Sequence, residues 1–361
     1  CRLRFACGLL ADIVARPGAN HGARAMPAFS GWYTRAHAIN ELSRDANTRE
    51  PKGISMYKIH CLNNISAEGL ALLTENYELT ENIEEADAIL VRSANMHEMG
   101  IPENLKAVAR AGAGVNNIPL DALAEAGIPV FNTPGANANA VKELVIAGML
   151  LASRDIVGGI GWVRDNADDE NVGKAAEKAK KAFAGGEIFG KTLGVIGLGA
   201  IGKLVVAAAE ALGMKVVGYD PFLDAERAAA ISETMTFTSE LPELLAASNY
   251  VTIHVPAMDS TRGMIDAAAI DQMKDGAVFL NFSRDVLVDD AAMAAALESG
   301  KISRYVTDFA NPAVVKMERA IVLPHLGAST AEAEDNCAKM AVSEIMGYLE
   351  NGVKTHCVNG L

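Results

Sequence analysis

A glycine-rich turn between an apolar run and a helical run constrains the fold of this chain more than any other feature. Residues 193–196 are typical of a buried strand, the turn begins at Gly197, and residues 203–212 have the pattern of a helix. In that context Gly197 permits a tight turn, Gly199 lets the backbone approach a pyrophosphate, and Gly202 lets the helix pack close to the strand. The N–H groups at the start of the helix favour a phosphate. The segment therefore predicts a dinucleotide-binding unit of a parallel sheet.

The next strand indicates which dinucleotide binds. Residues 215–219 are mostly apolar and end at Asp220, about 20 residues beyond the glycines, where a carboxylate accepts ribose hydroxyl groups. This carboxylate repels a 2′-phosphate, and the neighbouring Pro221 and Phe222 provide no cation. We therefore expect NAD as the cofactor, rather than NADP. The alternative is that the glycines only form a tight turn and that Asp220 only caps a helix.

The composition excludes several classes of protein. The chain has 361 residues, 50% of them hydrophobic, and a net charge of -13, so it can bury a core and repels polyanions. We therefore expect a small anionic substrate bound by individual arginines, with no nucleic-acid partner and no membrane partner. The five cysteines include no C-x-x-C pair, which predicts no disulfide framework, no metal site and a reducing, cytoplasmic location. The apolar stretch 144–152 is far shorter than the ~20 residues of a membrane span.

The first 55 residues differ from the rest in composition. Residues 1–55 carry a formal charge of +4, whereas residues 56–361 carry -17. The first segment lacks apolar periodicity and contains three prolines, and a strand-like run begins directly after Met56. We interpret residues 1–55 as an atypical N-terminal extension, either an artefact or an arginine-rich leader, and exclude it from the fold.

From Met56 onward, short apolar runs alternate with helical patterns, which predicts parallel sheets with crossover helices. The length predicts two or three domains, since domains usually have about 100–200 residues. Residues 165–186 are charged and rich in Ala and Lys, so we expect an exposed helix or linker there.

Polar side chains stand at the ends of several predicted strands in the second half of the chain. They include His254 with Pro256, Arg284, Asp308 and His325. In an open parallel sheet, ligands bind outside the carboxyl ends of the strands, so these residues are candidates for a site. Taken alone, His325 is more often a structural histidine than a base, and Arg284 is more often a surface ion-pair partner.

Three motifs together resemble the D-isomer-specific 2-hydroxyacid dehydrogenases. They are residues 197–202, 281–284 and 324–330, and residues 110–118 and 132–137 extend the similarity. The resemblance implies an α/β fold of two doubly wound parallel-sheet domains, in which a Rossmann NAD-binding domain is inserted into a smaller, flavodoxin-like substrate domain.

The resemblance also implies roles for the residues at the strand ends. Arg284 binds the substrate carboxylate with its planar, permanently charged guanidinium, and His325 is the acid/base that accepts the hydroxyl proton. The expected cofactor contacts are Gly197, Gly199, Ala200, Ile201, Gly202, Asp220, His254, Pro256 and Asp308. The expected substrate contacts are Arg92, Ser93, Gly114, Val115 and Asn137, of which the first two match a phosphate-binding pair.

The chain departs from the family at one catalytic position. The family has a glutamate five residues after the aspartate of this strand end, where it pairs with the histidine, but here Asp308 is followed at that distance by Ala313. Without this carboxylate, His325 loses the group that orients its ring. Glu318 is the nearest candidate replacement. A second departure is Asp285, where glycine is commoner, and this acid either weakens the binding of an anion or points to solvent.

Within the family, the chain most resembles members that oxidise 3-phosphoglycerate to 3-phosphohydroxypyruvate with NAD, in serine biosynthesis. We expect this activity from a homodimer without a C-terminal regulatory domain. One alternative is an NAD-binding paralogue that is weakly active or inactive because of Ala313. Another is a dehydrogenase of an unphosphorylated D-2-hydroxy acid, in which Arg92 has no phosphate to bind.

The predicted domains follow from the same comparison. We expect a substrate domain from residues 56–150 and 326–361 and an NAD-binding domain from residues 151–325, with the site in the cleft between them. Two long helices, over residues 141–163 and 331–349, are expected to cross between the domains and to act as a hinge.

Overall fold

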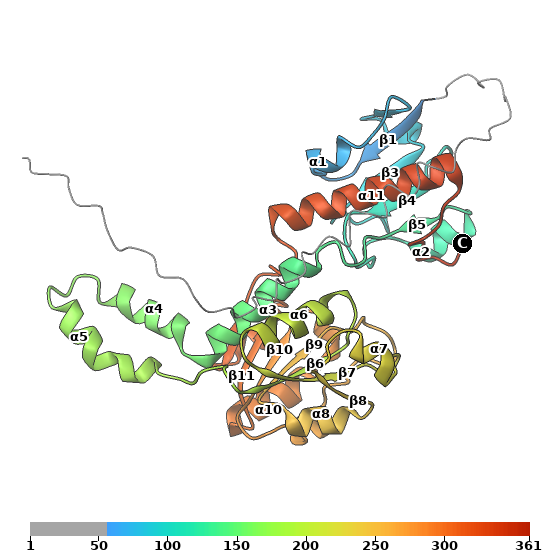
Figure 1. Ribbon diagram of the computed structural model, residues 1–361. Helices are drawn as coiled ribbons and strands as arrows, with labels where there is room; N and C mark the ends of the chain where they lie inside the picture. The colour runs from blue at the N-terminus through green and yellow to red at the C-terminus, as the bar shows by residue number, and fades with distance from the viewer. Residues whose placement is uncertain (1–55) are drawn as a thin grey trace, which may run out of the picture. The chain divides into compact units, whose positions relative to one another are not determined.

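The computed structural model describes residues 56–361, and the interpretation of residues 1–55 lies outside that range. The described chain alternates strands and helices and forms two sheets in which all strand pairs are parallel (Figure 1). The predicted α/β fold with two doubly wound parallel sheets is confirmed.

The first sheet has five strands in the order β2-β1-β3-β4-β5. Its strands are β1 (Tyr57–Cys61), β2 (Tyr77–Leu79), β3 (Ala88–Val91), β4 (Ala107–Arg110) and β5 (Val130–Phe131). This is the flavodoxin-like order, whose direction reverses between β1 and β3, and ligands bind at such a reversal. The short helices α1 (Ala67–Leu70) and α2 (Leu120–Glu125) belong to this part of the chain.

The second sheet has seven strands in the order β12-β11-β10-β9-β6-β7-β8. Its strands are β6 (Thr192–Ile196), β7 (Lys215–Tyr219), β8 (Thr236–Thr238), β9 (Tyr250–Ile253), β10 (Ala277–Asn281), β11 (Ile302–Thr307) and β12 (Ala320–Val322). This is the dinucleotide-binding order extended by one strand, and its reversal lies between β6 and β9. The glycine-rich turn directly follows β6, so the sequence motif is located at the reversal.

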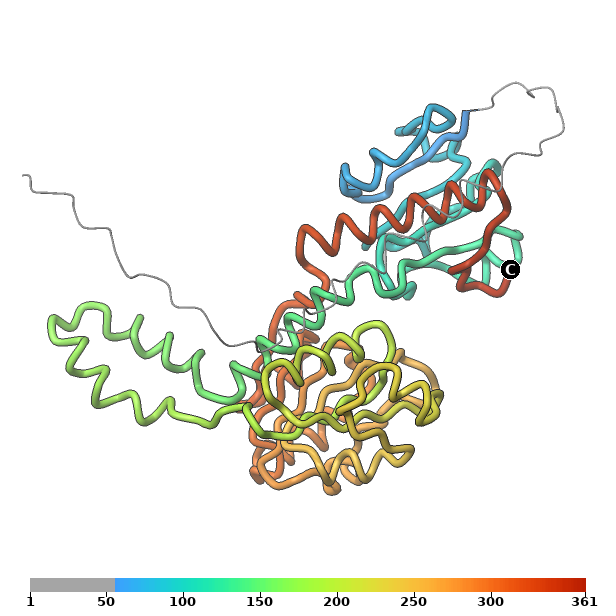
Figure 2. Tube along the Cα trace, viewed as in Figure 1, coloured from blue at the N-terminus to red at the C-terminus, as the bar shows by residue number. Residues whose placement is uncertain are grey.

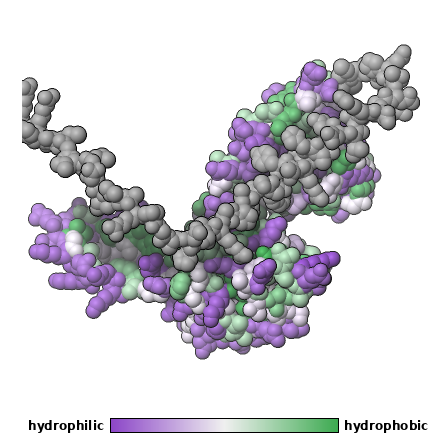
Figure 3. Space-filling model, viewed as in Figure 1, coloured by the Kyte–Doolittle hydropathy of each residue, from purple (hydrophilic) through white to green (hydrophobic). Residues whose placement is uncertain are grey.

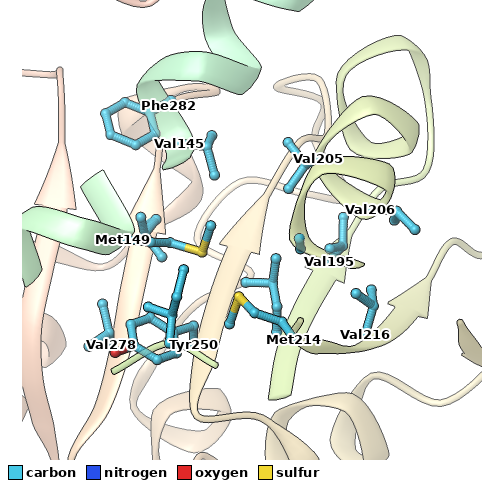
Figure 4. Close-up of a cluster of buried hydrophobic side chains, with 14 of the residues drawn as sticks. Val145, Met149, Val195, Val205, Val206, Met214, Val216, Tyr250, Val278 and Phe282 are labelled. Atoms are coloured by element: carbon cyan, nitrogen blue, oxygen red, sulfur yellow. The ribbon is translucent and has the colours of Figure 1, made fainter. Parts of the chain in front are cut away.

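Helices cover both faces of the second sheet. One face packs against α3 (Ala138–Ser153) and α6 (Ala200–Ala211), through a cluster that includes Val145, Met149 and Val205 (Figure 4). The other face packs against α8 (Leu241–Ala247), α9 (Ala267–Asp271) and α10 (Asp290–Ser299). The remaining short helix is α7 (Ala225–Ala229). Because both faces are buried, the strands are apolar on both sides, which agrees with the near-continuous apolar runs of the sequence.

The long C-terminal helix α11 (Ala331–Asn351) returns to the first sheet, where it packs against α1 and β4 (Figure 2). Its buried side chains Cys337, Ala341, Val342 and Ile345 share a core with Ile59 of β1. The helix predicted over residues 331–349 is therefore confirmed.

The predicted continuous helix over residues 141–163 is wrong. The structure has two helices, α3 and α4 (Ile156–Asp165), with a bend of 67° between them. The first ends because Arg154 takes an extended conformation (φ -139°, ψ 150°), and Asp155 starts the second by accepting a hydrogen bond from the Gly158 N–H at 3.0 Å. Within residues 56–361, no single helix is long and apolar enough to span a membrane. Only the bent pair of α3 and α4, taken together, has that length and apolarity.

Candidate active site

A cavity of about 1300 Å³ lies where residues from both sheets and from α11 meet. Its walls include the segment after β3 with Arg92 and Ser93, the glycine-rich segment after β4, and the segment after β10 with Arg284. The loop that carries His325 and the first turns of α11 complete it. The carboxyl ends of parallel strands therefore face this cavity, as expected of a ligand site in such folds.

Four arginines line the cavity, Arg92, Arg110, Arg262 and Arg284, and three of them, Arg92, Arg110 and Arg284, affect one another's charge. Burial lowers the pKa of Arg110, and the positive charges of Arg284 and Arg92 lower it further, so the three guanidinium groups are close enough to interact. Arg110 donates a hydrogen bond from Nε to the Arg92 carbonyl at 3.1 Å, which connects the guanidinium of Arg110 to the backbone of Arg92. Such a cluster is suited to a ligand with more than one negative charge.

Two glycines let the arginines approach the backbone. A Cβ atom at Gly114 would lie 2.8 Å from Nη2 of Arg284, and one at Gly112 would lie 2.2 Å from Nη1 of Arg110. Arg284 also donates from Nη1 to the Ser283 carbonyl at 2.6 Å. The glycine-rich segment after β4 is thus the surface on which two guanidinium groups rest, which is a physical reason for its composition.

His325 has an unusual backbone conformation. Its φ of 50° lies in the left-handed region, and among residues 56–361 it is the only residue other than glycine with a positive φ. The backbone is held by hydrogen bonds from the His325 N–H to the carbonyls of Asp308, at 2.9 Å, and Leu323, at 3.1 Å. The imidazole packs edge-to-face on Phe309, with ring centroids 5.2 Å apart and an angle of 69°. Strained residues of this kind are concentrated at functional sites, where the surrounding structure maintains them.

Asp308 presents an unsatisfied oxygen close to this histidine. The residue is 2% exposed, its Oδ2 accepts a hydrogen bond from the Gly327 N–H at 2.8 Å, and its buried Oδ1 has no partner within the described chain. Burial raises the pKa of Asp308, while the Gly327 N–H and the charges of His325 and Arg284 act in the opposite direction. A buried carboxylate oxygen without a donor is costly, so its presence points to a ligand N–H.

The position of the missing glutamate lies outside the cavity. Ala313 is exposed at the start of a short 3-10 turn, and neither Ala313 nor the exposed Glu318 belongs to the cavity wall. Glu318 therefore does not replace the family glutamate in this structure. Asp285 does line the cavity, where it is exposed and accepts a hydrogen bond from the Val286 N–H at 2.8 Å.

The glycine-rich turn after β6 has the geometry that a dinucleotide needs. Gly197 has a φ of 89°, and a Cβ atom at Gly202 would lie 1.9 Å from the Gly197 carbonyl oxygen. A Cβ atom at Gly199 would meet nothing within 4 Å, so the space above the turn is open. No side chain caps α6, which leaves its first N–H groups free for phosphate oxygens.

The acid at the end of β7 is oriented by the same turn. Asp220 accepts hydrogen bonds from the Leu198 N–H through Oδ2 and from the Phe222 N–H through Oδ1, both at 2.9 Å. Each carboxylate oxygen retains a lone pair for a ribose hydroxyl. Together with the orphaned oxygen of Asp308, the residues present fit NAD.

His254 is half-buried next to the turn. Its carbonyl oxygen would lie 2.6 Å from a Cβ atom at Gly197, its Nε2 lies 3.0 Å from the Thr252 hydroxyl, and its buried Nδ1 has no partner within the described residues. Burial lowers the pKa of His254 to about 3. The ring is therefore neutral at physiological pH and acts through shape and hydrogen bonding.

The cavity brings together about half of the residues predicted from the sequence. Those on its wall are Arg92, Ser93, Gly114, Val115, Asn137, Pro256, Arg284 and His325. Those outside the wall are Gly197, Gly199, Ala200, Ile201, Gly202, Asp220, His254 and Asp308. The sequence analysis missed Arg110, Phe309 and Glu334 as part of this site, although Arg110 ends a strand just as Arg284 follows one.

These features define a class: an α/β protein that binds NAD at the strand reversal of a parallel sheet and presents a histidine and arginines in an adjacent cavity. Comparison with known families agrees, because "D-isomer specific 2-hydroxyacid dehydrogenase, NAD binding domain" matches residues 146–327. The chain belongs to the D-isomer specific 2-hydroxyacid dehydrogenases.

Individual relatives carry different names within this family. A D-3-phosphoglycerate dehydrogenase of Mycobacterium leprae (strain TN) is 38% identical over 268 residues, which are 72% of this chain and 48% of that protein. A hydroxypyruvate reductase of Thermotoga maritima is 33% identical over 320 residues, which are 82% of this chain and 99% of that protein. The chain thus spans about half the length of the phosphoglycerate dehydrogenases that it matches.

A solved structure extends the comparison to the cofactor. The NAD-bound 3-phosphoglycerate dehydrogenase of Entamoeba histolytica superposes with a TM-score of 0.68 at 26% identity, over 84% of this chain and 99% of that one. The prediction of NAD as the cofactor is confirmed by the matched NAD-binding family and by this neighbour.

Proposed function

We propose that this chain catalyses the NAD-dependent oxidation of 3-phosphoglycerate to 3-phosphohydroxypyruvate, the reaction that leads into serine biosynthesis. The observation that supports it is the convergence of the neighbouring Arg92, Arg110 and Arg284 with His325 on a single cavity. A carboxylate and a phosphate on one small substrate require two cationic subsites, and a secondary alcohol requires a base between them.

In this proposal the arginines and the histidine of the cavity have different tasks. Arg284 binds the substrate carboxylate and polarises the reacting carbon–oxygen bond. His325 takes the proton of the C2 hydroxyl as the carbonyl forms, and returns it in the reverse reaction. Arg92, Ser93 and Arg110 bind the phosphate, and the backbone at Gly114 and Val115 with Asn137 supports the substrate from the other side.

The residues that hold NAD are those of the turn and the neighbouring strand ends. Gly197 to Gly202 and the start of α6 bind the pyrophosphate, Asp220 binds the ribose, and Asp308 accepts the nicotinamide carboxamide, with His254 and Pro256 along the cofactor. When bound, NAD accepts the hydride that leaves C2 of the substrate.

The experiment compares substrates. We expect NADH formation with 3-phosphoglycerate to have a higher kcat/KM than with D-lactate, D-glycerate or 2-hydroxyglutarate. Arg92→Ala should raise the KM for 3-phosphoglycerate and leave that for D-lactate unchanged. Equal effects of this substitution on both substrates would contradict a phosphate subsite at Arg92.

Two observations favour other functions. The similarity to a hydroxypyruvate reductase favours an unphosphorylated 2-hydroxy acid, in which case D-glycerate is the best substrate of the series. Ala313 in place of a glutamate favours a weakly active or inactive paralogue, in which case NAD binds and no substrate of the series is turned over.

We further propose the domain division of residues 56–150 with 326–361 and residues 151–325, and a hinge at their connections. The separate sheets support this division. Helix α3 is the exception to this division: it packs on the second sheet through Val141, Val145 and Met149, so by its contacts residues 138–150 move with the NAD-binding part.

We also propose a cytoplasmic homodimer. The charged residues of this part of the chain gather in α5 (Val172–Ala179) and beside it (Figure 3), whereas Val157, Ile160 and Val163 of the mostly apolar α4 are 49–53% exposed. Their spacing of three residues places them along one side of the helix. A second copy of the chain would cover this stripe, and Ile160→Asp should then shift the mass measured by light scattering from dimer to monomer. A wild-type monomer would contradict this proposal.

A further inference from the structure

One arginine of the cavity is already paired with an acid. Nη2 of Arg92, directly after β3, lies 2.6 Å from Oε1 of Glu334 in the first turn of α11. Both side chains line the cavity and are partly exposed, at 39% and 42%. The arginine that the proposed function assigns to the phosphate is therefore paired with a carboxylate.

The cavity wall that holds the Arg92–Glu334 pair also contains a buried cysteine. Cys337 lies one turn further along α11, is buried, and lines the same cavity. Burial chiefly raises the pKa of the Cys337 thiol, while the charges of Arg110 and Arg92 lower it and that of Glu334 raises it. The charges of the two arginines and of Glu334 thus all act on one thiol, and Glu334 supplies the negative charge among them.

Glu334 is not needed to hold the Arg92 backbone. The Arg92 N–H donates to Oδ1 of Asn63 at 3.0 Å, and its carbonyl accepts from Arg110 at 3.1 Å. The backbone is fixed by these bonds, so Glu334 acts on the guanidinium alone. A partly exposed ion pair contributes about 0–1 kcal/mol, so a ligand can displace it.

We propose that Glu334 is an internal competitor for Arg92, which keeps free inorganic anions out of the phosphate subsite and is displaced by a substrate that also binds Arg284. Inorganic phosphate occupies only the subsite of Arg92, Ser93 and Arg110, and must displace Glu334 with the contacts of that subsite alone. A phosphorylated 2-hydroxy acid has a carboxylate as well, and this second anchor offsets the displacement. Glu334 therefore weakens every ligand of Arg92 by a similar factor, which a substrate with two anchors tolerates and a free inorganic anion does not, and the inference rests on the proposed phosphate subsite.

The test compares Glu334→Gln with Glu332→Gln. Glu332 lies in the same helical turn, is exposed and does not line the cavity, so its substitution removes the same charge from the same helix end. For Glu334→Gln we expect competitive inhibition by inorganic phosphate to strengthen about three- to tenfold, and the KM for 3-phosphoglycerate to fall to a similar extent. The kcat, and the KM for D-glycerate, should stay within about twofold. Glu332→Gln should leave all four values unchanged.

Two results would overturn the inference. A higher KM for 3-phosphoglycerate in Glu334→Gln would show that the carboxylate orients Arg92 for the ligand. Equal effects of the two substitutions would show a general effect of charge at the helix end. Glu334→Asp, which keeps the carboxylate on a shorter side chain, should lie between wild type and Glu334→Gln.

The proposed function can fail separately. If the wild-type chain oxidises D-glycerate but not 3-phosphoglycerate, the substrate assignment is wrong, and inhibition by inorganic phosphate is then measured with D-glycerate. Stronger inhibition in Glu334→Gln alone would still support competition at Arg92. Unchanged inhibition would overturn it.

Discussion

At the scale of single residues, His325 has an aromatic neighbour where the family resemblance implies a carboxylate. Within residues 56–361, the imidazole forms no side-chain hydrogen bond, and its ring contact is with Phe309. An aromatic edge-to-face contact orients a ring but does not stabilise its protonated form as a carboxylate does.

Ala313→Glu should therefore raise the kcat for the best 2-hydroxy acid by about tenfold, a fraction of the 10²–10⁴-fold that general acid–base catalysis contributes. The position is exposed, so a larger side chain meets no packing penalty there. Steady-state kinetics with NAD measures the effect, and Glu318→Gln, an exposed position to which we assign no role at His325, is the control without effect. An unchanged kcat in Ala313→Glu would show that Phe309 alone orients the ring sufficiently.

At Asp308, the proposed binding of NAD and the stability of the folded protein place opposite demands on the side chain. Its Oδ1 is buried without a donor, and burial raises its pKa, so the ionised carboxylate is unfavourable in the protein without NAD. Asp308→Asn removes that charge and should stabilise the NAD-free protein at pH 7 by about 1 kcal/mol. The affinity for NAD should fall at least tenfold, because an amide N–H₂ at this place cannot accept a hydrogen bond. Thermal unfolding and an NAD titration measure the two effects, and a variant that is both less stable and a normal NAD binder would contradict the assignment.

At the scale of elements, the contact between α1 and α11 depends on one glycine. A Cβ atom at Gly69 would lie 2.5 Å from Cβ and 2.6 Å from the carbonyl carbon of Ala338. Alanine is the better helix former by about 1 kcal/mol, but the clash is with backbone, which cannot move aside. We expect Gly69→Ala to destabilise the protein by about 1–3 kcal/mol, measured by urea unfolding. Gly100→Ala, where a Cβ atom meets nothing within 4 Å, is the matched control, and equal stability of both variants would contradict this packing.

The elements also show what the sequence could and could not predict. The apolar runs before the glycine-rich turn and before Asp220 are strands β6 and β7, because alternating strands and helices leave a strong pattern. The break at Arg154 was missed, because residues 156–163 continue a helical pattern and only the bond from the Gly158 N–H to Asp155 starts a new helix. Arg110 was missed for another reason: its role depends on Arg92 and Arg284, which only the folded chain brings near it.

At the scale of the whole molecule, the residues that we propose to bind NAD and substrate come from two sheets formed by different parts of the chain. The C-terminal helix α11 contacts β4 and carries Glu334 and Cys337 into the cavity, while the loop just before it carries His325. The site therefore exists only when both sheets and this helix are folded. Global stability and activity are consequently linked, and a buried group that titrates should affect both.

His254 is such a group. Burial lowers its pKa to about 3, whereas in the unfolded chain a histidine titrates near pH 6.5. Between these values the unfolded state binds one more proton, so the free energy of unfolding should fall as the pH falls from about 6.5 towards 3, by up to about 1.4 kcal/mol per pH unit. His254→Gln, which has no titrating group, should lack this component, so the difference between the pH profiles of the two proteins isolates it from the titration of carboxylates. Urea unfolding at pH 7, 6 and 5 provides the measurement. Parallel profiles would show that the ring is solvated and takes up its proton in the folded protein.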